Sequence, residues 1–268
     1  MQVECIGLVT DYGYEAGFVG VLHAVALSIA PGMPVLDLDH SVPPGDVRLG
    51  ALRLERLVRY VPPAVFVGVV DPGVGGGRRP VALQAARHLF VGPDNGLLRW
   101  AAEVAAGGSE VRAVVLDGEG CWLPDRSRTF DGRDVFVPVA AHLASGRDLA
   151  EVGSPLDLGD LVTIDRPLCA VEGDVARLEI VQVDGFGNVQ LSGDRRTVEE
   201  LDWQHGDMLE LVPGGAVATY AGTFGDVGAG QALVLLDSDG CLSWSINRGR
   251  GDSVLSLPSG SAVSIRRR

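Results

Sequence analysis

Lysine is absent from the 268-residue sequence, so each of its 22 basic residues is an arginine. The protein therefore cannot form a lysine Schiff base, use a Ser–Lys nucleophile or bind phosphate with the lysine of a Walker loop. A Gly-x-Ser-x-Gly motif is also missing, which argues against a serine hydrolase of the α/β type. The five histidines contain no i, i+4 pair, so the sequence does not predict a His-based metal site.

Cysteine is scarce and scattered, and long apolar runs are missing. The four cysteines lie far apart, which argues against a zinc ribbon or a redox pair and is typical of a reducing cytosol. The first residues carry no basic cluster, and the apolar stretch over residues 18–30 is too short to span a bilayer. We therefore expect a soluble cytoplasmic protein with no membrane partner.

Negative charge outweighs positive charge, with 35 acidic residues against 22 basic ones and a net charge of −13. A negative surface repels phosphate backbones, so no nucleic-acid partner is expected. Hydrophobic residues make up 46% of the chain, which is enough for a sizeable core in one large domain or two modest ones.

The first part of the chain alternates strand-like and helix-like segments. Continuous apolar runs at 5–9 and 64–70 are typical of strands buried on both faces. Apolar residues repeat at helical spacing over 18–29 and 47–61, and proline follows both segments. We further predict strands at 80–84, 88–92 and 112–116 and a helix near 133–145. This alternation predicts an α/β domain with a largely parallel sheet over residues 1–166.

The remainder of the chain contains short strand-like runs separated by Asp-Gly and Gly-Gly turn signals. The predicted strands cover 175–183, 188–192, 208–212, 232–236, 241–246 and 261–266. No helix of any length is expected among them. The pattern predicts a small all-β domain, a barrel or a sandwich, over residues 167–268.

Two loops at predicted strand ends combine glycine with charged residues. The segment TDYG places Asp11 after the first strand, where its carboxylate can accept hydrogen bonds from ribose hydroxyls or cap the next helix. The segment VVDPGVGGGRR holds Asp71 and Arg78 at opposite ends of a glycine-rich loop, which a turn could bring together. Such a loop either approaches a ligand with its backbone or is a plain surface turn.

Other polar segments have simple structural interpretations. GPDNGLL predicts a tight turn before a helix, with Asp94 or Asn95 as its cap. In TFDGRDVF, Arg133 can pair with a neighbouring aspartate at the start of a helix. The segments 183–188 and 238–240 predict hairpin turns.

Six motifs occur in order along nearly the whole chain: TDYG, DHSVPPGDV, VVDPGVGGGRR, GPDNGLL, TFDGRDVF and DGFGN. In this order and approximate spacing they resemble the S-adenosyl-L-methionine (SAM) hydroxide adenosyltransferase family, the adenosine-forming SAM hydrolases, whose relatives are the fluorinases and chlorinases. The resemblance implies an N-terminal α/β domain and a small C-terminal β-barrel. It implies a homotrimer whose small-molecule substrate lies between one subunit's first domain and its neighbour's second. It also implies that water or hydroxide displaces methionine from the ribose 5′ carbon with no metal or cofactor.

The resemblance assigns roles to individual residues. Asp71 and Arg78 match the family's catalytic pair, and Asp11 matches its ribose-binding carboxylate. The residues that match contacts to methionine and adenine lie in the second domain: Asp184, Phe186, Asn188, Ser238 and Arg248. Among these, the first three match the segment at the methionine end, where an aspartate suits the ammonium group. The serine lies in the turn that contacts the methionine carboxylate, and the arginine lies near the adenine-binding segment.

Asp131 stands where the family has a third catalytic residue, a histidine. An ionised carboxylate cannot donate a hydrogen bond to the nucleophile, so its role differs. Three interpretations are open. Asp131 accepts a proton from the attacking water, or it pairs with Arg78 or Arg79 and orients that residue. In the third interpretation the site binds an adenosyl ligand with little turnover, as a SAM or adenosine sensor.

Other positions separate this chain from the halogenases, which place Tyr where Asp71 stands. The fluorinase has a Ser near its halide at the position of Gly132. A halide-dependent adenosyl transferase is therefore the less favoured alternative. Gly45 replaces a larger side chain beside the ribose, and Ile246 stands where the fluorinase has an Arg, so the pocket walls differ as well.

Overall fold

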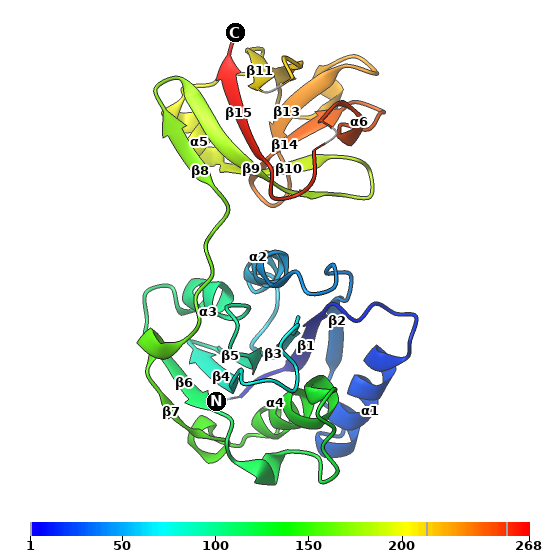
Figure 1. Ribbon diagram of the computed structural model, residues 1–268, viewed down its shortest axis with the longest axis vertical. Helices are drawn as coiled ribbons and strands as arrows, with labels where there is room; N and C mark the ends of the chain where they lie inside the picture. Colours follow the sequence, from blue (N-terminus) through cyan, green and yellow to red (C-terminus); the bar gives the residue numbers. More distant parts are fainter. Residues whose placement is uncertain (1, 213, 256) are drawn as a thin grey trace. The chain divides into compact units, whose positions relative to one another are not determined.

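The chain folds into two units, which cover residues 1–165 and 166–268 (Figure 1). The computed structural model describes residues 2–212, 214–255 and 257–268. Each unit surrounds hydrophobic clusters of its own. The two-domain architecture expected from the sequence is confirmed. Within the described residues, no helix is long and apolar enough to cross a membrane.

A seven-stranded sheet forms the middle of the N-terminal unit, in the order β2-β1-β3-β5-β4-β6-β7. Its strands are β1 (Cys5–Thr10), β2 (Val35–Asp39), β3 (Ala64–Val69), β4 (Pro80–Ala85), β5 (His88–Pro93), β6 (Val111–Val115) and β7 (Ser154–Leu156). β1 pairs in parallel with β2 and β3, and β3 pairs in parallel with β5. β4 runs antiparallel to β5 because only a tight turn connects them, and it also runs antiparallel to β6. The predicted largely parallel sheet is confirmed, with β4 and β7 as its reversed strands.

Helices cover both faces of this sheet. α1 (Phe18–Ile29) and α4 (Val137–Ala144) lie on one face, and α2 (Val47–Leu57) and α3 (Arg99–Ala106) lie on the other (Figure 1). Every residue of β1, β3 and β5 is buried between these layers, which explains their continuous apolar runs. Helix α2 ends at Leu57, short of the predicted residue 61, and turns lead from it to Pro62-Pro63.

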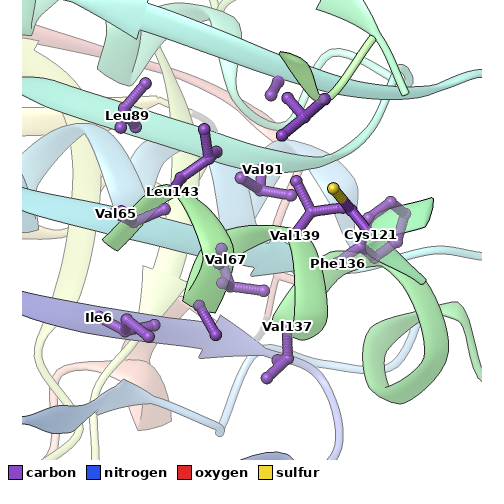
Figure 2. Packing of buried hydrophobic residues seen from close by; sticks show 14 of the residues in the cluster. Ile6, Val65, Val67, Leu89, Val91, Cys121, Phe136, Val137, Val139 and Leu143 are labelled. Carbon is purple, nitrogen blue, oxygen red and sulfur yellow. The ribbon is translucent and has the colours of Figure 1, made fainter. Parts of the chain in front are cut away.

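The side chains between the sheet and α4 interlock closely. Figure 2 shows Val65 and Val67 of β3 in one cluster with Val137 and Val139 of α4, and all four are fully buried. Removing each such side chain from water contributes about 1.5–3 kcal/mol to folding. This packing fixes α4 and the π-helical turn Gly132–Phe136 that precedes it. π-turns of this kind occur frequently at functional sites.

Seven strands of the C-terminal unit close into a barrel in the order β9-β10-β14-β13-β12-β11-β15, because β15 pairs back to β9. β8 extends the sheet beside β9. The strands are β8 (Cys169–Glu172), β9 (Val175–Val183), β10 (Val189–Asp194), β11 (Met208–Val212), β12 (Val217–Tyr220), β13 (Ala232–Leu236), β14 (Cys241–Ile246) and β15 (Ala262–Arg267). Because β10 and β15 both pair with β9, the sheet closes and the predicted barrel is confirmed. Trp244 is fully buried in the core of this unit.

Two short helices accompany the barrel: α5 (Arg195–Glu200) and α6 (Asp252–Leu255). The side chain of Asp194 caps α5 by accepting hydrogen bonds from the backbone N–H groups of Arg196 and Thr197. Six and four residues are too few to show a helical period in the sequence, which explains why neither helix was expected.

Candidate active site

The polar loops of the N-terminal unit meet at the carboxyl ends of β1 and β3. These strands pair in register, with Thr10 opposite Val69, so the residues that follow them are neighbours. A cavity of about 330 Å³ lies there, lined by Asp11 and Tyr12 after β1, by Asp71 after β3 and by residues 129–133 before α4. Ligands of open α/β sheets bind at such strand ends.

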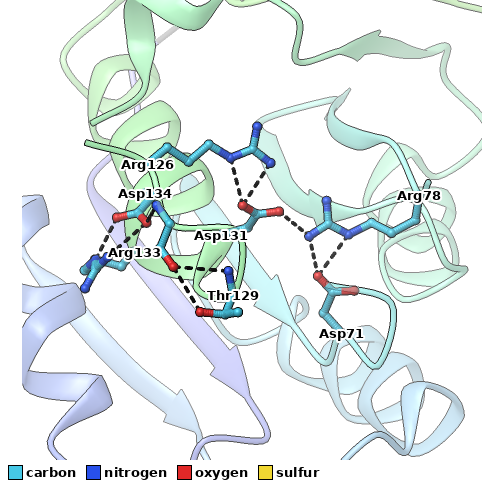
Figure 3. A network of polar contacts seen from close by, with 8 residues as sticks. Asp71, Arg78, Arg126, Thr129, Asp131, Arg133 and Asp134 are labelled. Atoms are coloured by element: carbon cyan, nitrogen blue, oxygen red, sulfur yellow. Dashed lines mark hydrogen bonds and ion pairs between the residues drawn. The ribbon is translucent and has the colours of Figure 1, made fainter. Parts of the chain in front are cut away.

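Asp71 and Arg78 form a buried ion pair across the glycine-rich loop (Figure 3). Arg78 donates to Asp71 Oδ2 from Nε at 2.9 Å and from Nη2 at 2.5 Å. The loop folds back through Gly75, whose φ of +73° favours glycine, and a Cβ there would lie 2.5 Å from the carbonyl oxygen of Arg128. The glycine-rich segment is therefore a tight packed turn that brings its two charged ends together.

One oxygen of Asp71 is left free by this pairing. Oδ1 is buried and has no hydrogen-bond partner among the residues that the structure describes. Burial lowers the pKa of the Arg78 guanidinium, but its hydrogen bonds and charge pairing with Asp71 and Asp131 outweigh burial and hold that pKa above its usual value. Arg78 thus stays charged, and Asp71, which lines the cavity, keeps one buried acceptor unused.

Asp131 lies on the other side of Arg78. Its side chain is 1% exposed, and its Oδ2 accepts from Arg78 Nη2 at 2.5 Å. Its Oδ1 accepts from Arg126 Nε at 3.0 Å (Figure 3). Of the interpretations left open by the sequence, this geometry favours the one in which Asp131 orients Arg78. Arg79 instead donates to Asp94 at 2.9 Å, and Asp131 makes no side-chain cap to the helix that follows it.

Asp11 is anchored from a different direction. Its Oδ2 accepts from the backbone N–H of Gly45 at 2.9 Å, and Gly45 has a φ of +76°, which suits glycine. The alternative in which Asp11 caps the next helix is wrong, because the N-cap of α1 is Gly17 and no side chain caps it.

A buried histidine supports the turn that carries Asp11. His40 Nε2 lies 3.0 Å from Asp37 Oδ1, and its Nδ1 lies 2.7 Å from the hydroxyl of Thr10. Because a carboxylate only accepts, Nε2 donates to Asp37, and Nδ1 is left to bond with the Thr10 hydroxyl. Thr10 Oγ1 in turn accepts from the backbone N–H of Tyr12 at 3.2 Å.

Aromatic side chains form one wall of the cavity, and no sequence motif indicated this. The rings of Tyr12, Phe18 and Phe130 contact one another with centroid distances of 5.2–5.7 Å. Burial, and after it the charges of Asp11, Asp71 and Asp131, raise the pKa of Tyr12 well above its usual value. The Tyr12 hydroxyl therefore remains a hydrogen-bond donor next to the three carboxylates.

Gly132 lies directly beneath that hydroxyl. A Cβ at position 132 would lie 2.3 Å from Tyr12 Oη, far inside van der Waals contact. No larger side chain fits there while Tyr12 keeps its place.

The C-terminal unit has a cavity of its own, of about 500 Å³. Asp184, Phe186 and Asn188 of the β9–β10 turn line it together with Ser238 of the β13–β14 turn. Asp184 organises its own turn, accepting from the backbone N–H groups of residues 186 and 188 at 2.9 Å and from the side chain of Asn188 at 2.8 Å. Phe186 is 82% exposed. The sequence predicted both segments as hairpin turns. It did not predict that the two turns line one cavity.

The structure thus gathers the predicted residues into two sets. Asp11, Asp71, Arg78 and Asp131 share the N-terminal site, and four residues of the second domain share the other cavity. Arg248 is exposed and lines neither cavity. In the part of the chain that the structure covers, no cluster of three His, Cys, Asp or Glu side chains is arranged to hold a metal ion.

Comparisons with known proteins match the two parts of the chain to two domains of one family. Residues 6–153 match the SAM hydroxide adenosyltransferase N-terminal domain, and residues 178–264 match the C-terminal domain. The chain is 44% identical to an (R)-S-adenosyl-L-methionine hydrolase of Salinispora tropica, over 97% of each chain. It is 36% identical to a protein of the same name from Thermus thermophilus, over 96% of this chain and 97% of the other.

A crystal structure of an uncharacterised conserved protein from Thermotoga maritima superposes with a TM-score of 0.89 at 35% identity. The alignment covers 98% of this chain and 100% of that one. With both family domains matched in order, the chain belongs to the SAM hydroxide adenosyltransferase family.

Proposed function

We propose that this protein hydrolyses SAM to adenosine and L-methionine. The observation that carries the proposal is the buried Asp71–Arg78–Asp131 arrangement beside a cavity that also contains Asp11. The names of the Salinispora and Thermus relatives support the same activity.

The reaction needs an oriented nucleophile more than an acid. A water oxygen bonds to the ribose 5′ carbon while the carbon–sulfur bond breaks. The electron pair of the broken bond stays on sulfur, which neutralises the sulfonium as methionine leaves. Since sulfonium is already a good leaving group, no proton has to be supplied to it. Aligning the water behind the carbon–sulfur bond is then the large contribution to rate, and the cancellation of charge favours a dry pocket.

Asp71 is the residue suited to hold the water. Its Oδ2 is fully used by Arg78, whereas its Oδ1 is free to accept a hydrogen bond or a proton from the nucleophile. Arg78 fixes the rotation of the carboxylate with two hydrogen bonds, and Asp131 fixes Arg78 in turn. The proton released by the water passes to Asp71 and then to solvent.

The substrate contacts follow from the two sets of residues. Asp11 is placed to bind the ribose hydroxyls with the carboxylate that Gly45 anchors. We assign the methionine end to Asp184, Phe186, Asn188 and Ser238, which share one cavity. Support for Arg248 near adenine comes from the family resemblance alone.

We further propose a homotrimer in which each site combines the first domain of one subunit with the second domain of its neighbour. Family membership supports this, as does the distribution of the candidate residues over both domains. The test mixes two inactive variants, Asp71→Ala and Asp184→Ala, as co-expressed subunits. Random assembly regenerates about a quarter of the sites with both residues intact, whereas sites confined to one subunit would regain nothing.

A halide-dependent transfer is disfavoured by Asp71 and by the lack of space above Gly132. We also propose that no metal or cofactor takes part. We further propose that the protein is cytoplasmic, which is supported by four cysteines that are all free thiols.

Purified protein is incubated with SAM, with and without chelator and halide, and the products are separated by chromatography. Many equivalents of adenosine under every condition support the proposal, while a bound nucleoside without product, or a product that requires halide, contradicts it.

A further inference from the structure

Arg126 contacts Asp131, which lines the N-terminal cavity, and neither the motifs nor the proposed reaction assigned it a role. Its Nε and Nη2 both lie 3.0 Å from Asp131 Oδ1 (Figure 3). Its guanidinium also stacks over the ring of Trp122, with 4.6 Å from Cζ to the ring centroid. Two separate contacts, one ionic and one aromatic, therefore hold this side chain in a single orientation.

Arg126 adds a second positive charge beside the paired carboxylates of Asp71 and Asp131. Asp71 and Asp131 are 5% and 1% exposed, and Arg78 lies between them as a single positive charge. Two buried carboxylates facing one guanidinium would leave one negative charge uncompensated, which is costly in a buried site. Arg126 supplies the second positive charge, and the four groups alternate in sign as Arg126, Asp131, Arg78 and Asp71.

The order of the contacts shows what Arg126 controls. The two oxygens of Asp131 are divided, Oδ1 to Arg126 and Oδ2 to Arg78. Held at Oδ1, Asp131 cannot rotate to take a second hydrogen bond from Arg78. Arg78 is then left with its Nε and Nη2 on Asp71 Oδ2, which is the geometry that leaves Asp71 Oδ1 unused.

We propose that Arg126 is a positioning residue, which acts through Asp131 and Arg78 to fix the carboxylate of Asp71 toward the nucleophile. The inference rests on the proposed hydrolysis of SAM. Arg126 contributes to kcat rather than to substrate affinity, because its side chain contacts Asp131 and Trp122 and does not line the cavity.

The test compares Arg126→Gln and Arg126→Lys with wild-type protein, with kcat and KM for SAM measured in the same series. Loss of one partly exposed charged hydrogen-bond pair lowers kcat about five- to tenfold and leaves KM within about twofold. Lysine keeps the charge but loses the paired donors, so its kcat falls between those of the wild type and the glutamine variant. Arg177→Gln, which removes an exposed ion pair with Glu172 in the barrel, is the matched control and keeps wild-type kcat.

A double-mutant comparison separates positioning from a general structural role. In an Asp131→Asn background, Arg126→Gln changes kcat by less than about twofold, because its partner is already neutral. Thermal melts of all variants show whether stability changes; if Arg126→Gln does not fold, the lysine variant carries the comparison. The inference is overturned if Arg126→Gln keeps wild-type kcat or changes only KM. It is also overturned if Arg126→Gln lowers kcat as much in the Asp131→Asn background as in the wild type. Absence of adenosine with wild-type protein overturns the proposed function itself and this inference with it.

Discussion

Replacing Asp131 by asparagine tests how the site works with a carboxylate at this position. Asparagine has the same shape, so the packing around this fully buried side chain is kept. The amide has one acceptor oxygen, whereas Asp131 accepts from both Arg78 and Arg126. One arginine therefore faces an NH₂ group that cannot accept its hydrogen bond.

The size of the effect follows from the hydrogen bond that the amide cannot make. A hydrogen bond to a charged group contributes about 1.5–3 kcal/mol, and about 1.4 kcal/mol corresponds to a tenfold change in rate. If the contact to Arg78 matters mainly in the transition state, kcat falls about 10- to 150-fold. Substrate binding changes little because both carboxylate oxygens of Asp131 bond to arginines, Oδ1 to Arg126 and Oδ2 to Arg78.

Steady-state kinetics with SAM measures kcat and KM, and calorimetric titration with adenosine measures binding to the same protein. The expected result is a lowered kcat with KM and adenosine affinity within about twofold of wild type. An unchanged kcat would mean that Asp131 only supports the local fold, and a loss of adenosine affinity would place it in contact with the ligand.

Three further predictions concern single side chains. Asp71→Ala should lower kcat by at least about a thousandfold with the fold intact by circular dichroism, and turnover above that level would exclude Asp71 as the residue holding the nucleophile. Gly132→Ser should destabilise the N-terminal unit by about 1–3 kcal/mol in urea titrations because its side chain clashes with the Tyr12 hydroxyl, and Tyr12→Phe should restore most of that loss; no destabilisation would contradict the packing. Burial lowers the pKa of His88 from 6.5 to about 4, so protonation favours the unfolded state and stability is lost as pH falls below 6.5. Urea titrations of the wild type should show a free energy of unfolding that is about 2 kcal/mol lower at pH 5 than at pH 7. This difference should disappear in His88→Gln and persist in His205→Gln, whose histidine is exposed. An equal difference in the wild type and both variants would show that other groups cause it.

The main features of the fold could be predicted from local pattern. The buried run over residues 64–70 and the helical spacing over 18–29 correspond to β3 and α1 because sheet and helix impose their periods directly on the sequence. β12 was missed because it has only four residues. The mixed direction of the sheet follows from the short connection between β4 and β5.

The site was predictable only where neighbouring strand ends fix it. Asp11 and Asp71 come together because β1 and β3 are paired, and a turn brings Arg78 back to Asp71. The contact between Arg78 and Asp131 joins residues 53 positions apart and depends on how α4 packs, which no local pattern encodes. Arg126 belongs to none of the six motifs, and the sequence does not distinguish it from an arginine on the surface. Its role becomes visible only in its contact with Asp131.

Hydrolysis in water enriched in ¹⁸O tests the central claim most directly, because it follows the oxygen that forms the new bond. Asp71 is expected to present a water molecule to the ribose 5′ carbon, so mass spectrometry should find one ¹⁸O atom in the 5′ hydroxyl of each adenosine and none in methionine. Adenosine without the label, or a nucleoside carrying any other atom at the 5′ carbon, would contradict it.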